Sequence, residues 1–350
     1  MTSPGVHLRR TAENTAEIEA LAHAHGGRVG VAGVLGRLNR RATRVPVPGL
    51  AVEWGFAWDP DDASSERWWP QGITNSAHVP GVERPLLVTS WYAKDGRGSR
   101  ITVVDLETLR YRHVLLVVPE VHDGAAHARP LRVHAGGLVW AAPYLHVAGT
   151  RRGLFSCLME DIVAVEPGPR TFGHRFVLPV RFRYDAAHDD GEPMRYSFLS
   201  LDRSTEIPHL VAGEYGRRDM TKRIVRYPLD PQTLHLHAEE DGVSRPVSLD
   251  ERGLGHMQGA AIVQGRYYVT TSRGPWHLGA VQVGEPGAFR PHRHATPVGP
   301  EDICHWSGDG TDHQTDMLWS LSEYPGHRYV FCMRRSSFET PVVEPETPGR

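Results

Sequence analysis

Cysteine is scarce in this sequence. The 350 residues include three cysteines, Cys157, Cys304 and Cys332, which lie far apart and form no CxxC pair. Zinc ribbons need paired cysteines, and disulfide frameworks need an even number of cysteines at short spacings. Both are therefore excluded, and the scarcity indicates a reducing compartment, for which we expect the cytoplasm.

Surplus charge and long apolar runs are missing as well. The formal net charge is -2, acidic and basic residues are interspersed, and Lys94 and Lys222 are the only lysines. No stretch approaches a membrane span, which needs about 18 uninterrupted apolar residues, and the segment before Gly27 has no apolar region of the signal-peptide type. We therefore expect no nucleic-acid partner and no membrane partner.

Residues 14–25 are expected to form a short N-terminal helix. Ile18, Leu21 and Ala22 share one apolar face, and a pair of glycines follows at the end. The glycine-rich stretch 27–36 comes next, but a dinucleotide-binding loop would follow a strand and open a helix. We interpret residues 1–49 as this helix and a flexible lead-in, with no organic cofactor indicated.

From residue 50 onward, short apolar runs alternate with turns, which is typical of β-strands. One opening phrase recurs five times: PQGIT at 70, HAGGLV at 134, YSFLSL at 196, MQGAAI at 257 and PEDIC at 300. Repeated four-stranded units avoid exposed edges when they close radially. The sequence therefore predicts an all-β, five-bladed β-propeller over residues 50–335, whose last blade is completed by the strand within 50–60. Residues 336–350 are expected to form a disordered tail.

The order of these phrases resembles a group of actinobacterial five-bladed β-propeller-like proteins of unassigned function. The resemblance is carried by PQGIT, HAGGLVW, GEYG, MQGAA and LWSLSEYPGHRYV, and it covers residues 68–333. It implies the propeller fold and leaves the activity open.

In such a fold the openings of the first strands and the turns after the second strands meet at one mouth of the central channel. The expected opening residues are Gln71, His134, Gln258, Glu301 and Asp302, and the expected turn residues are Trp91, Glu214, Arg273, Glu323 and Tyr324. Alternation along a strand also places His256 on the same face as His134.

Two kinds of chemistry fit these residues. His134, His256 and Glu301 could bind iron, manganese or zinc as a two-histidine, one-carboxylate site, or the acidic residues could bind calcium. Without a metal, His134 would transfer protons with Glu301 and Asp302 as carboxylate partners. The substrate would then contact the remaining predicted binding residues, Gln71, Trp91, Glu214, Gln258 and Arg273. For Glu214 and Glu323 a structural role, bonding backbone N–H groups, is the stronger interpretation.

The equivalent opening positions hold different residues in each copy, which favours one asymmetric site over a repeated binding site. We therefore expect an enzyme that acts on a small metabolite by non-redox chemistry, as a hydrolase, lyase or cyclising isomerase. A binding protein for a single ligand and a glycosidase- or lactonase-like hydrolase remain as alternatives.

Overall fold

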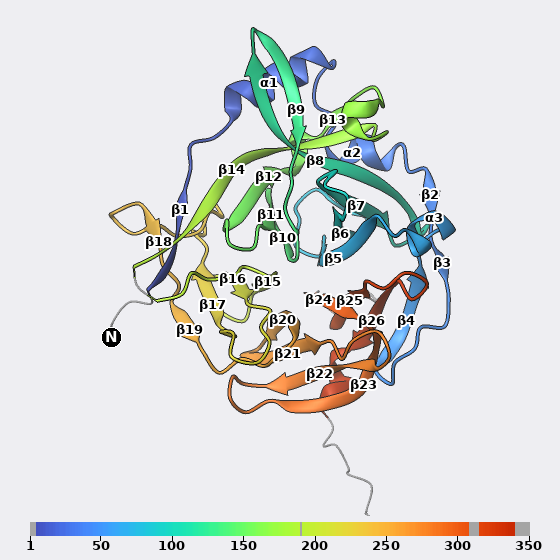
Figure 1. The fold of residues 1–350 in the computed structure, drawn as a ribbon, viewed down its shortest axis with the longest axis vertical. Helices are drawn as coiled ribbons and strands as arrows, with labels where there is room; N and C mark the ends of the chain where they lie inside the picture. Colours follow the sequence, from blue (N-terminus) through green and yellow to red (C-terminus); the bar gives the residue numbers. More distant parts are fainter. Residues whose placement is uncertain (1–4, 190, 308–314, 340–350) are drawn as a thin grey trace, which may run out of the picture.

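The computed structural model describes residues 5–189, 191–307 and 315–339, and within them the chain is mostly β with few helices. The strands fall into antiparallel series that surround a common centre (Figure 1). The first series is β5 (Trp68–Asn75), β6 (Leu86–Ala93), β7 (Ser99–Asp105) and β8 (Arg110–His122). The second is β10 (Leu138–Ala141), β11 (Tyr144–Ala148), β12 (Leu154–Leu158) and β14 (Phe176–His188).

Three further sheets complete the arrangement. One contains β15 (Phe198–Asp202), β16 (His209–Gly213), β17 (Ile224–Pro228) and β19 (Ser248–Asp250). The next contains β20 (Met257–Val263), β21 (Arg266–Thr271), β22 (Leu278–Gly284) and β23 (Arg290–Val298). The last contains β24 (Pro300–Trp306), β25 (Met317–Ser322), β26 (Tyr329–Arg334), β4 (Val52–Ala57) and β3 (Thr43–Arg44).

A parallel pair joins the first two series, which the sequence did not predict. β8 and β14 pair in parallel over Leu115–Val117 and Val177–Pro179, so both series belong to one 13-stranded sheet. Four short strands extend this sheet: β1 (Val6–Arg10), β2 (Arg40–Arg41), β9 (Ala125–Pro130) and β13 (Val163–Ala164). β18 (Val243–Ser244) pairs with β1.

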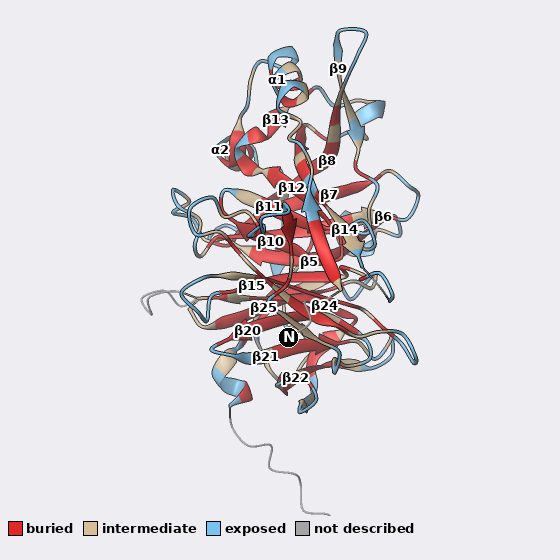
Figure 2. Cartoon of the chain, turned by 90° about the vertical axis from the view of Figure 1, so that its left-hand side faces the viewer, coloured by how far each residue is buried: buried red, intermediate tan, exposed pale blue. Residues whose placement is uncertain are grey.

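The first strands of the successive series, β5, β10, β15, β20 and β24, contact one another around the centre. Their residues are almost entirely buried (Figure 2). A Cβ atom on Gly137 would lie 2.1 Å from the main-chain nitrogen of Leu199, and one on Gly259 would lie 2.6 Å from that of Ile303. The glycines of the three opening phrases that contain one are therefore needed, because neighbouring first strands approach too closely there for a side chain.

The N-terminal residues are ordered parts of the fold. The predicted helix is confirmed as α1 (Thr15–Ala24), with Ile18, Leu21 and Ala22 buried. The glycine-rich stretch is not the flexible lead-in that we expected: it forms α2 (Gly30–Leu35), since Val31 and Val34 pack into the core. Three 3-10 turns are η1 (Met159–Asp161), η2 (Pro169–Thr171) and η3 (Arg335–Phe338). Most of the expected tail, from residue 340 onward, lies outside the described residues.

As predicted, the strand within residues 50–60 completes the last sheet, because β4 pairs with β26. The helix α3 (Pro60–Ser64) follows at once, and the Asp59 carboxylate caps it by accepting a bond from the Asp62 N–H. Among the described residues, no helix is long and apolar enough to cross a membrane.

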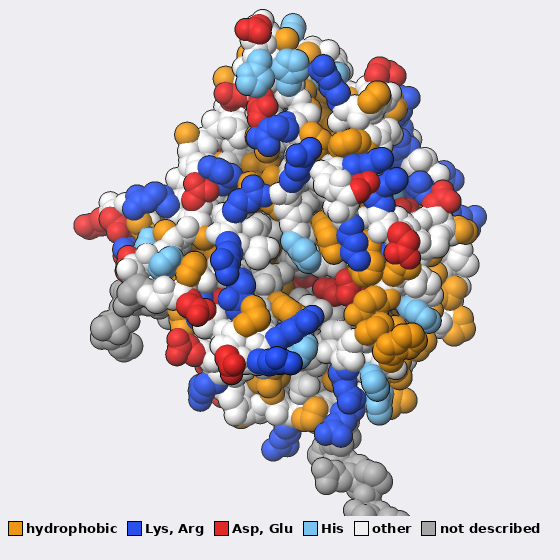
Figure 3. All heavy atoms as spheres, in the orientation of Figure 1, with side chains coloured by type: hydrophobic (Ala, Val, Ile, Leu, Met, Phe, Trp, Pro, Cys, Tyr) orange, Lys and Arg blue, Asp and Glu red, His pale blue; other side chains and the backbone are white. Residues whose placement is uncertain are grey.

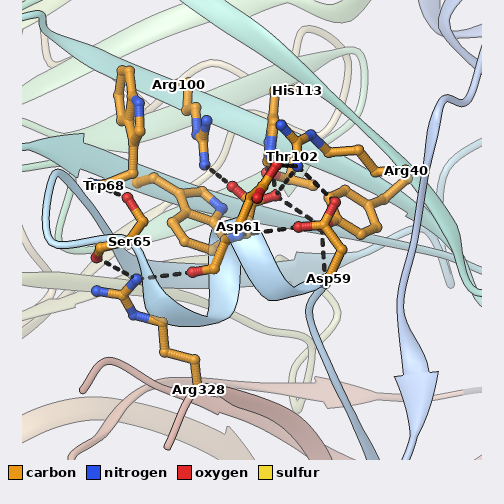
Figure 4. A network of polar contacts seen from close by, with 12 residues as sticks. Arg40, Asp59, Asp61, Ser65, Trp68, Arg100, Thr102, His113 and Arg328 are labelled. Carbon is orange, nitrogen blue, oxygen red and sulfur yellow. Dashed lines mark hydrogen bonds and ion pairs between the residues drawn. The ribbon is translucent and has the colours of Figure 1, made fainter. Parts of the chain in front are cut away.

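Asp62 connects α3 to the first series of strands, and Figure 4 shows Arg100 and His113 of that series beside α3. Its buried carboxylate accepts hydrogen bonds from Arg100 Nη2 at 2.7 Å and Tyr111 OH at 2.7 Å, and lies 2.9 Å from His113 Nε2. Burial disfavours the carboxylate, but His113 and Arg100 outweigh burial and hold the pKa of Asp62 well below its usual range. From the other side, Arg328 Nη1 donates to the carbonyl of Asp62 at 2.8 Å. The helix after β4 is therefore bonded to the first series of strands through Arg100 and Tyr111, and to the turn before β26 through Arg328.

We expect Asp62→Ala to lower the free energy of unfolding by about 3–5 kcal/mol, because it leaves the buried Arg100 guanidinium without its counter-charge. Urea unfolding followed by tryptophan fluorescence measures this change. The matched control is Asp61→Ala, whose side chain is 86% exposed, and it should change the free energy by less than about 0.5 kcal/mol. Equal effects of the two substitutions would show that the Asp62 contacts do not support the fold.

Candidate functional site

Two glutamates from neighbouring elements meet at the mouth of the channel. Glu301 lies near the start of β24, and Glu323 follows β25. Their side chains are hydrogen-bonded to each other. Gln258 Nε2 donates to Glu301 Oε1 at 3.2 Å, and Gln71 Nε2 donates to Glu323 Oε2 at 3.3 Å. Three first strands and one turn therefore converge on a carboxyl pair that is flanked by two amides.

Both carboxyl groups of the pair have raised pKa values. Burial raises the pKa of Glu301 well above its usual range, and the charges of Glu323 and Asp302 add to this. Burial also raises the pKa of Glu323, although Gln71, Lys94 and Arg328 oppose the shift. Two carboxyl groups in one poorly solvated site resist simultaneous ionisation and titrate as a coupled pair. The larger upward shift of the pKa of Glu301 favours the protonated form at Glu301, whose hydrogen-bond partner in the pair is Glu323.

Aromatic rings surround this pair. His134 stacks on Tyr92, with ring centroids 4.3 Å apart and an interplanar angle of 25°. Burial and the charges of Glu323 and Glu301 raise the pKa of Tyr92 to about 12, so its hydroxyl is a donor at neutral pH. Loss of solvent around the ring lowers the pKa of His134, although the residue is exposed. Its role in proton transfer stays a prediction.

A cation and a second aromatic group complete the wall of the site. Lys94 Nζ lies 3.1 Å from the ring centroid of Trp69, and Tyr324 meets Trp69 edge-on at 6.1 Å. Figure 3 shows acidic side chains in a hollow near the middle of the face that Figure 1 presents. The site therefore combines proton-carrying groups with flat surfaces suited to a small ligand.

Asp302 does not take part in this site, which corrects the prediction. Its side chain is fully buried, and Oδ2 accepts bonds from the main-chain N–H groups of Ile73 and Leu138, both at 3.3 Å. A side chain without exposed surface cannot touch a substrate at the mouth. Asp302 instead ties β24 to β5 and β10.

Trp91 is also wrong as a substrate contact. It is fully buried, donates from Nε1 to Thr89 Oγ1 at 3.0 Å and packs edge-on against Trp58. β6 continues to Ala93, so alternation turns Trp91 inward and Tyr92 outward. Tyr92 was not predicted as a site residue, because the turn was expected to begin at Trp91, whereas β6 continues to Ala93.

Glu214 has the structural role that we considered, and its assignment to substrate binding is wrong. The fully buried carboxylate accepts bonds from the main-chain N–H groups of Arg195 and Arg223, both at 3.0 Å. Arg223 Nη2 donates to it at 2.9 Å. Burial disfavours the charge, but these bonds lower the pKa of Glu214 overall. Both carboxylate oxygens of Glu214 are therefore bonded to groups of the protein.

The predicted metal ligands do not form a ligand set. The described part of the chain contains no group of three His, Cys, Asp or Glu side chains placed to hold a metal ion. His134 stacks on Tyr92, whereas His256 is exposed and its Nδ1 lies 3.4 Å from Tyr215 OH. Arg273 is exposed and makes no ion pair within the described residues, so its role as an anion contact stays a prediction.

The opposite ends of the same first strands line a cavity of about 310 Å³. Asn75, Leu138, Ser200, Ile262 and Cys304 contribute to its wall, and His78, Arg203 and His305 stand beside it. No ligand site was predicted at this end of the first strands. It therefore offers a second place at which a ligand could bind.

We expect Glu301→Gln to raise the melting temperature above that of the wild type at about pH 8, with a gain that shrinks toward about pH 4. The pKa of Glu301 is higher in the folded than in the unfolded state. Its stabilising contribution is therefore complete at low pH and is lost as the pH rises through the folded pKa, whereas glutamine does not ionise. Thermal unfolding across this pH range measures the effect.

The control is Glu53→Gln, because Arg334 lowers the pKa of the exposed Glu53. This variant should show no gain at high pH. A constant offset between Glu301→Gln and the wild type at every pH would contradict the proposed protonation of Glu301.

No family model matches this chain, and no curated protein matches it either. Sixty-two chains among the solved structures do match. One is a glutaminyl cyclase from Myxococcus xanthus, with 12% identity and a TM-score of 0.35 over 84% of this chain and 96% of that chain. A GH43_1 enzyme from Xanthomonas citri complexed with xylotriose has 14% identity and a TM-score of 0.34 over 91% of this chain and 92% of that chain.

A third match is the Dos1 propeller, with 8% identity and a TM-score of 0.29 over 93% of this chain and 70% of that chain. The resemblance to the actinobacterial proteins stays a prediction. The chain is distantly similar in structure to β-propeller proteins, some of them enzymes, and these matches assign it to no family.

Proposed function

We propose that this protein is an enzyme that acts on a small polar or aromatic metabolite by acid–base chemistry at the Glu301–Glu323 pair. The observation that carries the proposal is the contact between Glu301 and Glu323, two buried carboxyl groups whose pKa values are both raised, with Gln258 and Gln71 bonded to them. Enzymes that run acid and base steps at neutral pH use environments that separate the protonation states of two nearby groups.

Each residue of the site has a role in this chemistry. The Glu323 carboxylate would accept a proton from the attacking group of the substrate, and Glu301 would deliver its proton to the leaving group. Gln71 and Gln258 each use Nε2 to hold a carboxyl group, so their amide oxygens are available to a substrate. Lys94 would stabilise negative charge that develops during the reaction.

His134 and its aromatic neighbours would bind the body of the substrate. The imidazole and Tyr92 ring form one stacked surface, and Trp69 forms another. A neutral His134 can also relay a proton, which keeps the role predicted for it. Hydrolysis, elimination and cyclisation all fit this arrangement, because each moves protons without an electron acceptor.

The fold that we propose for this site is a five-bladed β-propeller over residues 50–335. The three separate sheets supply one blade each, and the 13-stranded sheet supplies two blades that are joined by the β8–β14 pair. The contacts among the five first strands support this interpretation, because the first strand of each propeller blade lines the channel.

A binding protein without catalytic activity is the second candidate. It is favoured by the cavity of about 310 Å³ at the other end of the channel, which lies away from the carboxyl pair. In that case Glu301 and Glu323 would only stabilise the mouth.

The test is to incubate the protein with lactones, p-nitrophenyl glycosides, N-terminal glutaminyl peptides and a bacterial metabolite extract, and to detect products by mass spectrometry. We expect turnover that falls by a factor of about 100–10,000 in Glu301→Gln and Glu323→Gln. The control Glu53→Gln should keep full activity. Compounds that raise the melting temperature but remain unchanged, or full activity in both glutamate variants, would overturn the proposal.

A further inference from the structure

A pocket of about 320 Å³ lies beside α3, between β7, β8 and the turn that precedes β14. We call it the arginine pocket, because six arginines line it: Arg40, Arg67, Arg97, Arg100, Arg112 and Arg175. The carboxylates among its lining residues are Asp61 and Asp62. Positive charge is therefore in excess at the wall of this pocket.

Carboxylates outside the pocket neutralise part of this charge. Asp95 lies 2.7 Å from Arg67 Nε and 3.0 Å from Arg97 Nε. Arg40 Nη1 donates to Asp59 at 2.6 Å. Arg40, Arg67 and Arg97 are therefore paired with carboxylates. The excess positive charge belongs to the remaining arginines that line the pocket.

Among these remaining arginines, the positive charge of Arg112 is the least compensated by carboxylates. No carboxylate pairs with it within the described residues, and its guanidinium donates to the carbonyl of Arg37 at 3.3 Å. The pKa of Arg112 is lowered by burial first and then by the charges of Arg175 and Arg40. Arg175 itself reaches only Glu166, at 4.0 Å, and that carboxylate is 91% exposed. Two neighbouring cations thus lack an effective counter-charge.

Arg100 gives the pocket a fixed donor. Its side chain is 5% exposed, Nη2 is bound to Asp62, and the guanidinium carbon lies 4.4 Å from the ring centroid of Trp68. Its Nε–H is buried and has no hydrogen-bond partner within the described residues. Arg100 therefore lines the pocket with one donor unused, and a buried N–H group without a partner is costly.

We propose that the arginine pocket binds the phosphate group of a small phosphorylated metabolite. Guanidinium groups bind phosphate oxygens in paired, charge-assisted hydrogen bonds, and a dianion matches the unbalanced charges of Arg112 and Arg175. The pocket is larger than a phosphate group alone needs. Trp68 and Phe172 also line it and offer aromatic surface to the organic part of the ligand.

This inference does not depend on the proposed function. None of the lining residues of the arginine pocket belongs to the Glu301–Glu323 pair or to its amide partners. Failure of one proposal therefore leaves the other in place.

Calorimetric titration of the full chain at constant ionic strength tests the proposal, with phenyl phosphate, inorganic phosphate and succinate as probes. We expect phenyl phosphate to bind to one site, and Arg112→Met and Arg175→Met each to weaken binding about tenfold or more, because each removes a charged hydrogen-bond donor. Circular dichroism and the melting temperature verify that each variant is folded.

Arg110→Met is the matched control. Arg110 lies two positions from Arg112 on β8 and also donates to a main-chain carbonyl, that of Leu38 at 2.7 Å, but it does not line the pocket. It should change the affinity by less than about twofold. The proposal is overturned if neither phosphate binds, if Arg110→Met and Arg112→Met weaken binding equally, or if succinate binds as tightly as phenyl phosphate. Tighter binding of inorganic phosphate than of phenyl phosphate would overturn its assignment to an organic phosphate.

Discussion

Arg328 makes the contact on which the rest of the structure depends. Its fully buried guanidinium donates to the carbonyls of Asp62 and Ser65, at 2.8 and 2.7 Å, and its Nε donates to the carbonyl of Glu323 at 2.6 Å. The first two bonds hold α3, and the Asp62 carboxylate in turn holds Arg100. One side chain from the turn before β26 thus bonds directly to α3 and to the turn that carries Glu323, and through Asp62 it is connected to the first series of strands.

This closure explains why a carboxyl pair can persist at the mouth. The hydrogen bond between Glu301 and Glu323 would be lost if the turn after β25 could move, because each group would then gain solvation. The Arg328 bond to the Glu323 carbonyl limits that movement. Within the channel, Asp302 joins β24 to β5 and β10, and close contact at the glycines keeps the first strands in register. The site is therefore a product of the closed ring, and no single sheet contains it.

The sequence revealed those features that depend on local repetition. The opening phrases located the first strands, and the strand within residues 50–60 was correctly assigned to the last sheet. The parallel pairing of β8 with β14 could not be read in the same way, because it depends on how two 13-residue strands meet in space. Whether Trp91 faces the core or the surface depends on where β6 ends, since a shift of one residue exchanges the inner and outer faces of the strand.

The candidate site was predictable to a similar degree. Gln71, Gln258 and Glu301 were identified because they occupy equivalent positions in the repeated phrase, and the structure brings them together. Asp302, one residue further, turns toward the main chain of its neighbours instead. Which of two adjacent carboxylates faces the mouth depends on strand geometry that composition does not contain. Glu323 was expected to be structural, and its contact with Glu301 depends on how the turn after β25 lies against the start of β24.

The shared proton of Glu301 and Glu323 is the central claim of this account. Carbon-13 NMR of the glutamate carboxyl groups, assigned with Glu301→Gln and Glu323→Gln, would measure it directly. We predict two coupled titrations, with the Glu301 carboxyl still protonated at a pH where the other glutamates are ionised. Independent titration of both carboxyl groups near the usual glutamate pKa of about 4.3 would contradict the account.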